Sequence, residues 1–401
     1  MFELDQLAKE EGKKQTKTRF LYEALQAEGG RHFIGIVGPR GAGKTVLLKQ
    51  LASQVKDSFY LSLDTFKEED LFAIAKTLQD QYGIQRLFLD EVHFFKEFDS
   101  HIKQIYDFLH LRVYFTSSVA LAMIESSYDL SRRIKLFFLN PFSFREYLFF
   151  TQNILLPPLS LSDILERRWE KEHLRYPHAF ESYLKGGLHP FSLEEPDILT
   201  LLSNILQRIL HEDIPTVARL HLDELASIEK LITFIAKSPV EGINYSSLSN
   251  NIGITKYKAE QYVNLLEKAF VLMSLMPAGT NVLREPKVLM YLPFRLLYKE
   301  YPEAIGALRE DFTVQMLKTS HQGVTYLKSN RGAKTPDFLV QKDGKKIILE
   351  VGGRGKGMSQ FKGMDQFEKV RFVHDETTEG NRRPLFLLGF LESVATSPKP
   401  P

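Results

Sequence analysis

The chain has 401 residues, more than one hydrophobic core usually holds, so two or three domains are expected. Its composition, 43% hydrophobic and 25% charged, is that of a globular protein, and a net charge of +2 excludes a strong overall attraction to nucleic acid or anionic lipid. Cysteine is absent, which excludes disulfides and cysteine zinc sites, and no apolar run reaches the roughly 18 residues of a membrane span. We therefore expect a cytoplasmic protein with no membrane partner.

A phosphate-binding loop is predicted near the N-terminus. Residues 33–37 are apolar and indicate a buried strand, and helical periodicity begins at residue 46. Between them, Gly-Pro-Arg-Gly-Ala-Gly-Lys-Thr is typical of a loop whose backbone N–H groups surround nucleotide phosphates at a helix N-terminus. Lys44 is expected to reach the phosphates of ATP, and the Thr45 hydroxyl to bind Mg²⁺. The candidate nucleotide-binding residues are Gly38, Pro39, Arg40, Gly41, Ala42, Gly43, Lys44, Thr45 and Val46.

Two acidic residues end a later strand. Residues 58–64 and 86–89 predict the second and third strands, with a helix over 68–82 between them. Asp90 is expected to hold Mg²⁺, and Glu91 to polarise the attacking water as general base. The alternation of apolar runs with helical patterns favours a parallel α/β sheet covered by helices.

Polar and basic residues flank the next two strands. Residues 112–115 predict a strand followed by Thr-Ser-Ser, where Ser117 or Ser118 would contact the γ-phosphate or the catalytic water, or cap a helix. We select Ser117 as the site residue. Arg132 and Arg133 precede a strand over 135–139 and are candidates to stabilise transition-state charge, in cis or across the interface of a homo-oligomer. A solvated basic turn is the alternative interpretation of these arginines.

These segments carry a family resemblance. The chain contains GPRGAGKT, LFLDEVHFF, VYFTSSVAL and SRRIKLFFLNPFSFREYLFF. It resembles the bacterial and archaeal AAA-superfamily P-loop ATPases that carry a C-terminal restriction-endonuclease-like domain. The resemblance implies an AAA-type core over residues 1–150, with Lys44, Thr45, Asp90 and Glu91 in the roles given above.

The middle of the chain predicts a helical lid and then a winged helix. Residues 151–221 have helical patterns, and residues 222–292 show three helices followed by two short strands. In a winged helix the third helix usually enters a DNA groove. The candidate DNA-contacting residues are Lys256, Lys258 and Gln261 on that helix and Arg284 on the wing. A module that only packs against other domains is the alternative.

The last segment, residues 293–401, predicts a small α/β domain that resembles the PD-(D/E)xK nuclease core. That resemblance implies that Glu310, Asp337 and Glu350 hold one or two metal ions that activate water. The lysine of the motif is missing, because Gly352 stands at its position. Lys356 or Gln360 are candidate substitutes, and without one the domain is expected to be degenerate and to cut poorly.

The leading hypothesis is therefore a Mg²⁺-dependent ATPase whose nucleotide state is coupled to DNA binding. Two alternatives stay open at this point: a nucleotide-controlled switch that binds proteins, and an ATP-regulated nuclease that cuts.

Overall fold

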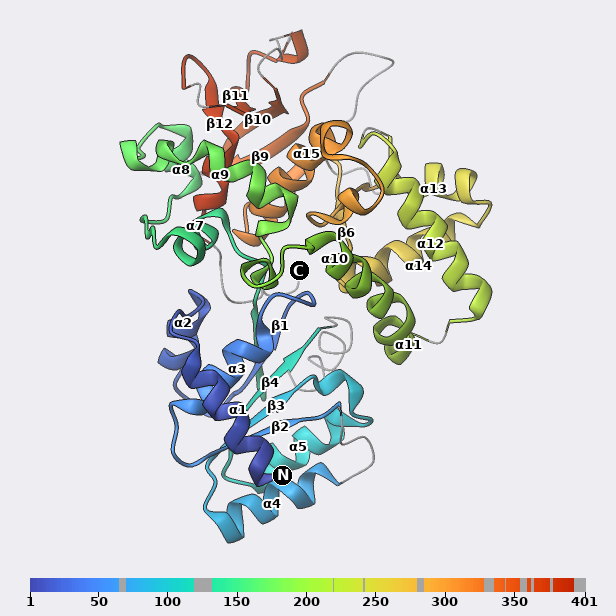
Figure 1. The fold of residues 1–401 in the computed structure, drawn as a ribbon. Coiled ribbons are helices and arrows are strands. Elements are labelled where there is room, and N and C mark those ends of the chain that lie inside the picture. Colours follow the sequence, from blue (N-terminus) through green and yellow to red (C-terminus); the bar gives the residue numbers. More distant parts are fainter. Residues whose placement is uncertain are drawn as a thin grey trace. The chain divides into compact units, whose positions relative to one another are not determined.

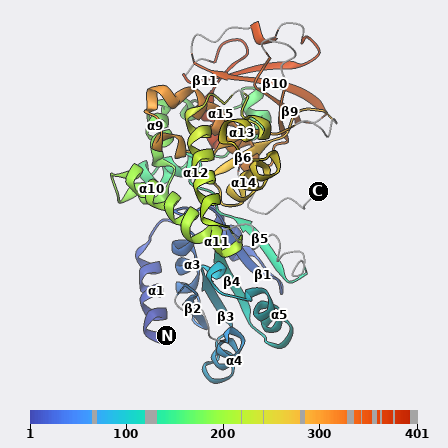
Figure 2. The same cartoon turned by 90° about the vertical axis from the view of Figure 1, so that its right-hand side faces the viewer.

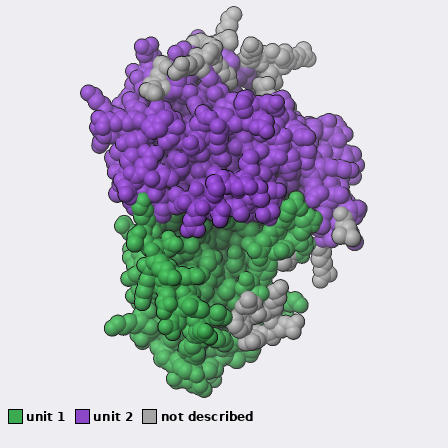
Figure 3. Space-filling model, viewed as in Figure 1, with its two compact units in different colours: residues 1–141, 207–219, 395–401 green, residues 142–206, 220–394 purple. Residues whose placement is uncertain are grey.

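The chain forms two compact units in a computed structural model. The structure describes residues 1–64, 70–118, 132–218, 220–240, 242–279, 285–327, 335–342, 344–353, 359–361, 364–375 and 378–392. Unit 1 comprises residues 1–141 with 207–219, and unit 2 comprises residues 142–206 with 220–394 (Figure 3). Arg284 and Lys356, both named above, lie outside the described residues.

Unit 1 is a parallel five-stranded sheet with the order β2-β3-β4-β1-β5 (Figure 1). Its strands are β1 Phe33–Val37, β2 Ser58–Ser62, β3 Arg86–Asp90, β4 Arg112–Ser117 and β5 Ile134–Phe138. Its described helices are α1 Phe2–Lys14, α2 Leu21–Ala27, α3 Lys44–Ser53, α4 Leu71–Tyr82, α5 Phe98–Phe108 and α11 Ile214–Val217. The predicted parallel α/β sheet is confirmed. Because every pair is parallel, the loops after β1, β3 and β4 leave the sheet at one edge.

Helix α1 covers the edge strand β2 and runs alongside α3 (Figure 1). An edge strand exposes unpaired backbone groups, and α1 supplies partners for two of them. The Asp5 carboxylate accepts the Tyr60 N–H at 2.7 Å, and Lys9 donates to the Ser58 carbonyl at 2.6 Å. Gly12 permits the close approach, since a Cβ there would lie 2.3 Å from the Lys49 carbonyl oxygen.

Unit 2 contains a mixed sheet with the order β12-β11-β10-β9-β8 and a separate antiparallel pair, β6-β7. Its strands are β6 Leu272–Leu275, β7 Lys287–Met290, β8 Val324–Tyr326, β9 Phe338–Lys342, β10 Lys345–Gly352, β11 Glu368–Val373 and β12 Arg382–Pro384. Its helices are α7 Phe144–Gln152, α8 Leu161–Leu165, α9 Pro177–Ser182, α10 Ile198–Arg208 (which ends in unit 1), α12 Leu222–Lys237, α13 Tyr245–Ile252, α14 Lys256–Lys268 and α15 Tyr301–Thr319. Helices α12, α13 and α14 lie together beside β6-β7 (Figures 1 and 2).

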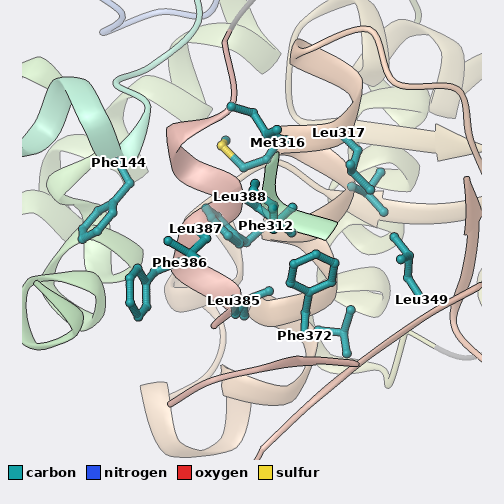
Figure 4. Packing of buried hydrophobic residues seen from close by; sticks show 14 of the residues in the cluster. Phe144, Phe312, Met316, Leu317, Leu349, Phe372, Leu385, Phe386, Leu387 and Leu388 are labelled. Atoms are coloured by element: carbon teal, nitrogen blue, oxygen red, sulfur yellow. The ribbon is translucent and has the colours of Figure 1, made fainter. Parts of the chain in front are cut away.

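One hydrophobic cluster runs through unit 2. Phe144 on α7 packs edge-on against Phe180 and Phe386, with ring centroids 5.4 and 6.1 Å away. Figure 4 shows the same cluster around Phe312 of α15 and Leu349 of β10. The cluster also takes in residues of β6 and β7, the strands of the predicted wing.

The contacts divide the chain differently from the boundaries expected at residues 150, 221 and 292. Helix α7 belongs to unit 2 because Phe144 is buried in that cluster. Residues 207–219 of the expected lid belong to unit 1, where Asp213 pairs with Arg40. The expected winged-helix and C-terminal segments share one core, since Leu289 and Phe312 lie in the same cluster, and they form one unit.

Candidate functional site: a phosphate loop with paired acids

The phosphate loop connects β1 to α3. Gly41 and Gly43 adopt positive φ values of 78° and 88°, which other residues reach only with strain. Gly38 is needed for another reason, since a Cβ there would lie 2.1 Å from the Leu139 carbonyl oxygen and only glycine fits between β1 and the end of β5. The loop thus has the backbone freedom to turn its N–H groups toward a ligand at the N-terminus of α3.

Lys44 is the first residue of α3 and is buried. Its ammonium group donates to the carbonyls of Gly38 at 2.9 Å and Pro39 at 3.0 Å, both within the loop. Burial lowers the Lys44 pKa, while the nearby carboxylates of Asp90 and Glu91 oppose that shift. A desolvated cation held inside the loop is suited to a polyphosphate, because anionic oxygens would replace the weaker carbonyl acceptors.

Three hydroxyl groups surround the carboxylate of Asp90. Tyr60 on β2 donates to it at 2.7 Å, Thr116 on β4 donates to its other oxygen, and Thr45 of the phosphate loop also bonds to it. Burial raises the Asp90 pKa, helped by the negative charge of Glu91, and the three hydroxyls oppose this rise. A hydroxyl and a carboxylate oxygen side by side are the ligands that Mg²⁺ prefers, so Thr45 and Asp90 fit the predicted metal role.

Glu91 occupies a strained backbone position directly after β3. Its φ of 54° lies in the left-handed region, which costs a non-glycine residue about 1–3 kcal/mol and is found mainly at functional sites. The Glu91 N–H donates to the Thr116 hydroxyl at 3.0 Å, and Ser118 donates to the two carboxylate oxygens at 3.1 and 3.3 Å. Glu91 is therefore fixed by Thr116 of β4 through its N–H and by Ser118, directly after β4, through its carboxylate.

Ser118, rather than the predicted Ser117, contacts the acid pair. Side chains alternate along a strand, so Thr116 and Ser118 share one face of β4 and Ser117 faces the other way. Ser117 contributes its backbone instead, since its carbonyl accepts the Gly38 N–H at 3.3 Å. Of the two serines considered, Ser118 is thus the one that bonds to Glu91.

Arg40 and His93 lie between Glu91 and a further acid, Asp213. Arg40 of the phosphate loop forms a two-pronged pair with Asp213, at 2.6 Å for both contacts, and its guanidinium lies 3.9 Å from Glu91. His93 sits between the acids, 3.3 Å from Glu91 and 3.7 Å from Asp213. Burial opposes ionisation of Asp213, but the bonds from Arg40 and His93 outweigh it and lower its pKa. Arg40 is thus held by a carboxylate that lies about 170 residues further along the chain.

Arg132 and Arg133 lie at the opposite edge of the sheet. Ile134 of β5 pairs with Phe33 at the start of β1, whereas the phosphate loop follows Val37. At about 3.3 Å per residue, the four residues from Phe33 to Val37 put roughly 13 Å between these levels. Arg133 also forms a two-pronged pair with Asp107, at 3.0 and 3.1 Å, and Arg132 is exposed. The expectation that they reach the phosphates in cis is corrected by this placement.

The site opens into a cavity of about 510 Å³ within unit 1. Thr45, Asp90 and Glu91 line one side, and Arg208, which the sequence did not single out, also faces it. Leu4 and Leu7 of α1 form an apolar wall with exposed fractions of 58% and 51%, so α1 offers uncovered apolar surface beside the acids. Sequence reasoning missed Tyr60, His93 and Asp213, which carry no local signal, and within the Thr-Ser-Ser run it selected Ser117 and not Thr116.

Of the nucleic-acid candidates on α14, Lys256 and Gln261 are exposed and Lys258 is partly buried, and the two lysines already have partners. Lys256 pairs with Glu285 at 2.6 Å, and Lys258 pairs with Glu224 at 3.3 Å. Gln261 is exposed, as is Asn264 one turn later. The α14 surface is therefore less positive than the lysine count indicates.

The expected metal triad of the C-terminal segment is not assembled. Glu350 lies opposite Asp337, because Leu349 pairs with Phe338 in the antiparallel ladder. Strand alternation places Ile347, Leu349 and Val351 on the face of the cluster that contains α15, and Glu350 on the other face. Glu310 on α15 pairs with Lys287 at 2.8 Å, and the Asp337 carboxylate accepts the Val351 N–H at 2.7 Å.

This placement overturns the expectation that Glu310 joins Asp337 and Glu350 around a metal. Within the part of the chain that the structure describes, no group of three or more His, Cys, Asp or Glu could hold a metal ion. Gln360, the second candidate substitute for the missing lysine, lies in the short 3₁₀ turn Ser359–Phe361.

Comparison with known proteins supports the ATPase assignment. Residues 30–148 match the family model of an AAA domain, and residues 179–291 match that of a domain of unknown function. An uncharacterized protein of Methanocaldococcus jannaschii is 28% identical over 425 residues, covering 94% of this chain and 89% of the relative.

Solved structures show only a distant likeness. A single-substitution variant of RuvB from Thermotoga maritima gives a TM-score of 0.27 at 15% identity, covering 68% of this chain and 90% of RuvB. AMPPCP-bound DnaA from Aquifex aeolicus gives 0.26 at 15% identity, covering 62% and 86%.

Residues 30–148 thus match the model of an AAA domain, and their phosphate loop and five-stranded parallel sheet are those of a P-loop nucleotide-binding domain. Among the described residues, no helix is long and apolar enough to cross a membrane.

Proposed function

We propose that this protein hydrolyses ATP with Mg²⁺ at the phosphate loop and couples its nucleotide state to the engagement of nucleic acid by unit 2. One observation carries the first half: Thr45, Asp90 and Glu91 line a common cavity at the carboxyl edge of one parallel sheet, and the buried Lys44 donates to the loop carbonyls beside them. That set supplies a phosphate-binding cation, two metal-binding oxygens and a general base.

Each residue has a step in hydrolysis. The loop N–H groups and Lys44 orient the phosphates and neutralise their charge, while Thr45 and Asp90 hold the metal. Mg²⁺ would withdraw charge from the transferred phosphoryl group. Glu91, aimed by its left-handed turn and by Ser118, accepts a proton from the attacking water. Arg40 and His93 keep Glu91 in place from the side of Asp213.

The first prediction tests the base. Glu91→Gln should retain Mg²⁺-dependent ATP binding and lower turnover about 100-fold or more, because the amide cannot take the proton. Steady-state phosphate release and the affinity for a labelled ATP analogue measure the two effects. Glu97→Gln is the matched control, since Glu97 also has a left-handed φ, 55°, and is exposed outside the cavity. Unchanged turnover in Glu91→Gln would remove Glu91 from the mechanism, and unchanged ATP binding in Lys44→Ala would remove the site itself.

Support for the nucleic-acid half is the order of α12, α13, α14 and the β6-β7 pair, which is that of a winged helix. The face of α14 presents Tyr257, 67% exposed, beside Gln261 and Asn264, side chains that stack on or bond to bases. DNA should therefore bind at low salt and change the ATPase rate, and Tyr257→Ala with Gln261→Ala should abolish both effects. Equal ATPase rates with and without DNA, and no binding, would leave a nucleotide-controlled protein switch.

We further propose that unit 2 does not cut nucleic acid efficiently, because Glu310 is engaged by Lys287 and Gly352 replaces the motif lysine. Cleavage of DNA in Mg²⁺ or Mn²⁺ that disappears in Asp337→Ala would overturn this and favour the ATP-regulated nuclease.

A further inference from the structure

A second cavity lies in unit 2, at the carboxyl ends of two parallel strands. Gly353 follows β10 and His374 follows β11, and the strands pair in parallel with Gly352 beside Val373. The His374 N–H donates to the Gly352 carbonyl at 3.1 Å, which closes the edge. The cavity measures about 370 Å³. Small-molecule sites usually measure about 300–1,000 Å³, and open parallel sheets bind ligands at this edge.

The cavity contains an arginine with no acid partner. Arg309 reaches it from α15, and its Nε donates to the Nδ1 of His374 at 3.1 Å. Among the described residues this is the one hydrogen bond of its guanidinium group, and no carboxylate of those residues lies within ion-pair distance. Burial lowers the Arg309 pKa, with Tyr301 opposing the shift. A half-buried guanidinium with unused N–H groups is costly unless an anion pairs with it.

His374 adds a second donor. Since its Nδ1 accepts from Arg309, the neutral ring carries its hydrogen on Nε2. Burial and then the charge of Arg309 lower the His374 pKa to about 4, against the opposing effect of Glu181 and Asp375. The ring is therefore neutral at pH 7 and can donate one hydrogen bond without a charge of its own.

Most of the remaining wall is apolar. Pro177, Phe180 and Phe386 line the cavity together with one acid, Asp375, and the Phe180 ring lies 5.2 Å from the His374 ring between centroids. Gly353 keeps room for the guanidinium, since a Cβ there would lie 3.3 Å from its NH1. The Arg309 cation and the neutral His374 donor thus lie against aromatic and aliphatic surface in one small space.

We propose that this cavity binds a small organic oxyanion, a phosphate or carboxylate group on an apolar or aromatic body, with Arg309 and His374 as its donors. The site lies wholly within unit 2 and uses no residue of the phosphate loop. It is separate from the proposed ATP site and does not depend on it.

The experiment uses the full chain with Lys44→Ala, so that the phosphate loop does not compete for the probe. Phenyl phosphate and benzoate are titrated separately, with calorimetry for affinity and the ¹⁵N signals of the His374 ring as the local reporter. We expect saturable binding of at least one probe with a change at His374, and none of phenol, which lacks the charge. Charge-assisted hydrogen bonds are worth about 1.5–3 kcal/mol, so Arg309→Met should weaken binding about 10- to 100-fold.

Arg168→Met is the matched control, because Arg168 is an exposed arginine of the same unit with its own acid partners. It should leave the affinity unchanged. Gly353→Ala provides a second variant should Arg309→Met fail to fold, since one methyl group crowds the guanidinium without removing its charge. A phosphate ligand is indicated if only phenyl phosphate binds, and a carboxylate if only benzoate does. No saturation with either probe, or equal affinity in both cavity variants, would overturn the proposal.

Discussion

Tyr60 bonds both to the N-terminal helix α1 and to Asp90, the proposed metal-binding acid. Its backbone N–H donates to Asp5 of α1, and its hydroxyl donates to Asp90 at 2.7 Å. Burial, followed by the negative charge of Asp90, raises the Tyr60 pKa, so the group remains a neutral donor. Its hydroxyl favours the ionised form of Asp90, the form that binds a metal.

Tyr60→Phe should therefore raise the Asp90 pKa further. The ATPase depends on ionised Asp90, so activity should be lost at a higher pH than in the wild type as the pH falls. We expect turnover at pH 7 to drop by several-fold, with recovery toward wild type at pH 8–9 or at high Mg²⁺. The measurement is the pH profile of the ATPase rate at two Mg²⁺ concentrations.

Tyr114→Phe serves as the control, because Tyr114 is equally buried in the same sheet and stacks on Phe88 at 4.9 Å without touching Asp90. If both variants shift the pH profile of the ATPase rate equally, or if Tyr60→Phe does not shift it, the hydroxyl of Tyr60 does not lower the Asp90 pKa.

Only part of the candidate ATP site could be predicted from local sequence patterns. The loop from Gly38 to Thr45 and the acids Asp90 and Glu91 were predicted, because the turn and the strand ends carry fixed residue types at short spacing. Tyr60 and Asp213 come from distant segments and have no such local pattern. The contact of Ser118 with Glu91 has the same origin: which of the two serines faces the acid depends on the register of β4, which short-range pattern does not give.

At the scale of elements, the docking of α1 depends on Gly12. Gly12→Ala would bring a methyl group to 2.3 Å from the Lys49 carbonyl on α3, and α1 would have to shift away from β2. Overpacking of this kind costs about 1–3 kcal/mol. We expect a lower unfolding temperature for the transition that responds to a Mg²⁺–nucleotide complex, since that transition belongs to unit 1.

Gly29→Ala is the control for Gly12→Ala, because Gly29 lies in unit 1 with no atom within 4 Å of an added Cβ. Thermal unfolding of both variants, with and without a non-hydrolysed ATP analogue, separates the outcomes. Equal midpoints in the two variants would show that α1 docks loosely.

The elements themselves were easier to predict than their grouping. Strands over 33–37 and 86–89 follow from short apolar runs with polar ends, and α14 starts at Lys256 after the cap Thr255, whose side chain accepts from the Lys258 N–H. The division of the chain followed long-range packing instead. Phe144 joins unit 2 through rings that lie about 40 and 240 residues away, contacts that periodicity alone does not reveal.

At the scale of the whole molecule, the two units should respond differently to acid, because unit 2 contains two histidines whose pKa values are lowered. Burial lowers the His189 pKa from 6.5 to about 4, and the nearby backbone of Leu292 opposes the shift. Burial also lowers the pKa of His374, in the same unit, to about 4. Each folded-state pKa is lower than the unfolded value, so protons bind preferentially to the unfolded chain between these limits.

The sign follows from that linkage. The stability contributed by neutral His189 is fully present above pH 6.5 and is lost as the pH falls toward 4. One pKa unit corresponds to about 1.4 kcal/mol, so between pH 7 and pH 5 His189 alone should cost unit 2 on the order of 2 kcal/mol. His189→Gln removes the titrating group. The urea midpoint of this variant should be lower than that of the wild type at pH 7, yet should fall less steeply toward pH 5.

His178→Gln, at an exposed position of unit 2, is the control and should keep the wild-type slope. A His189→Gln slope as steep as the control's would mean that acid acts on unit 2 through other groups.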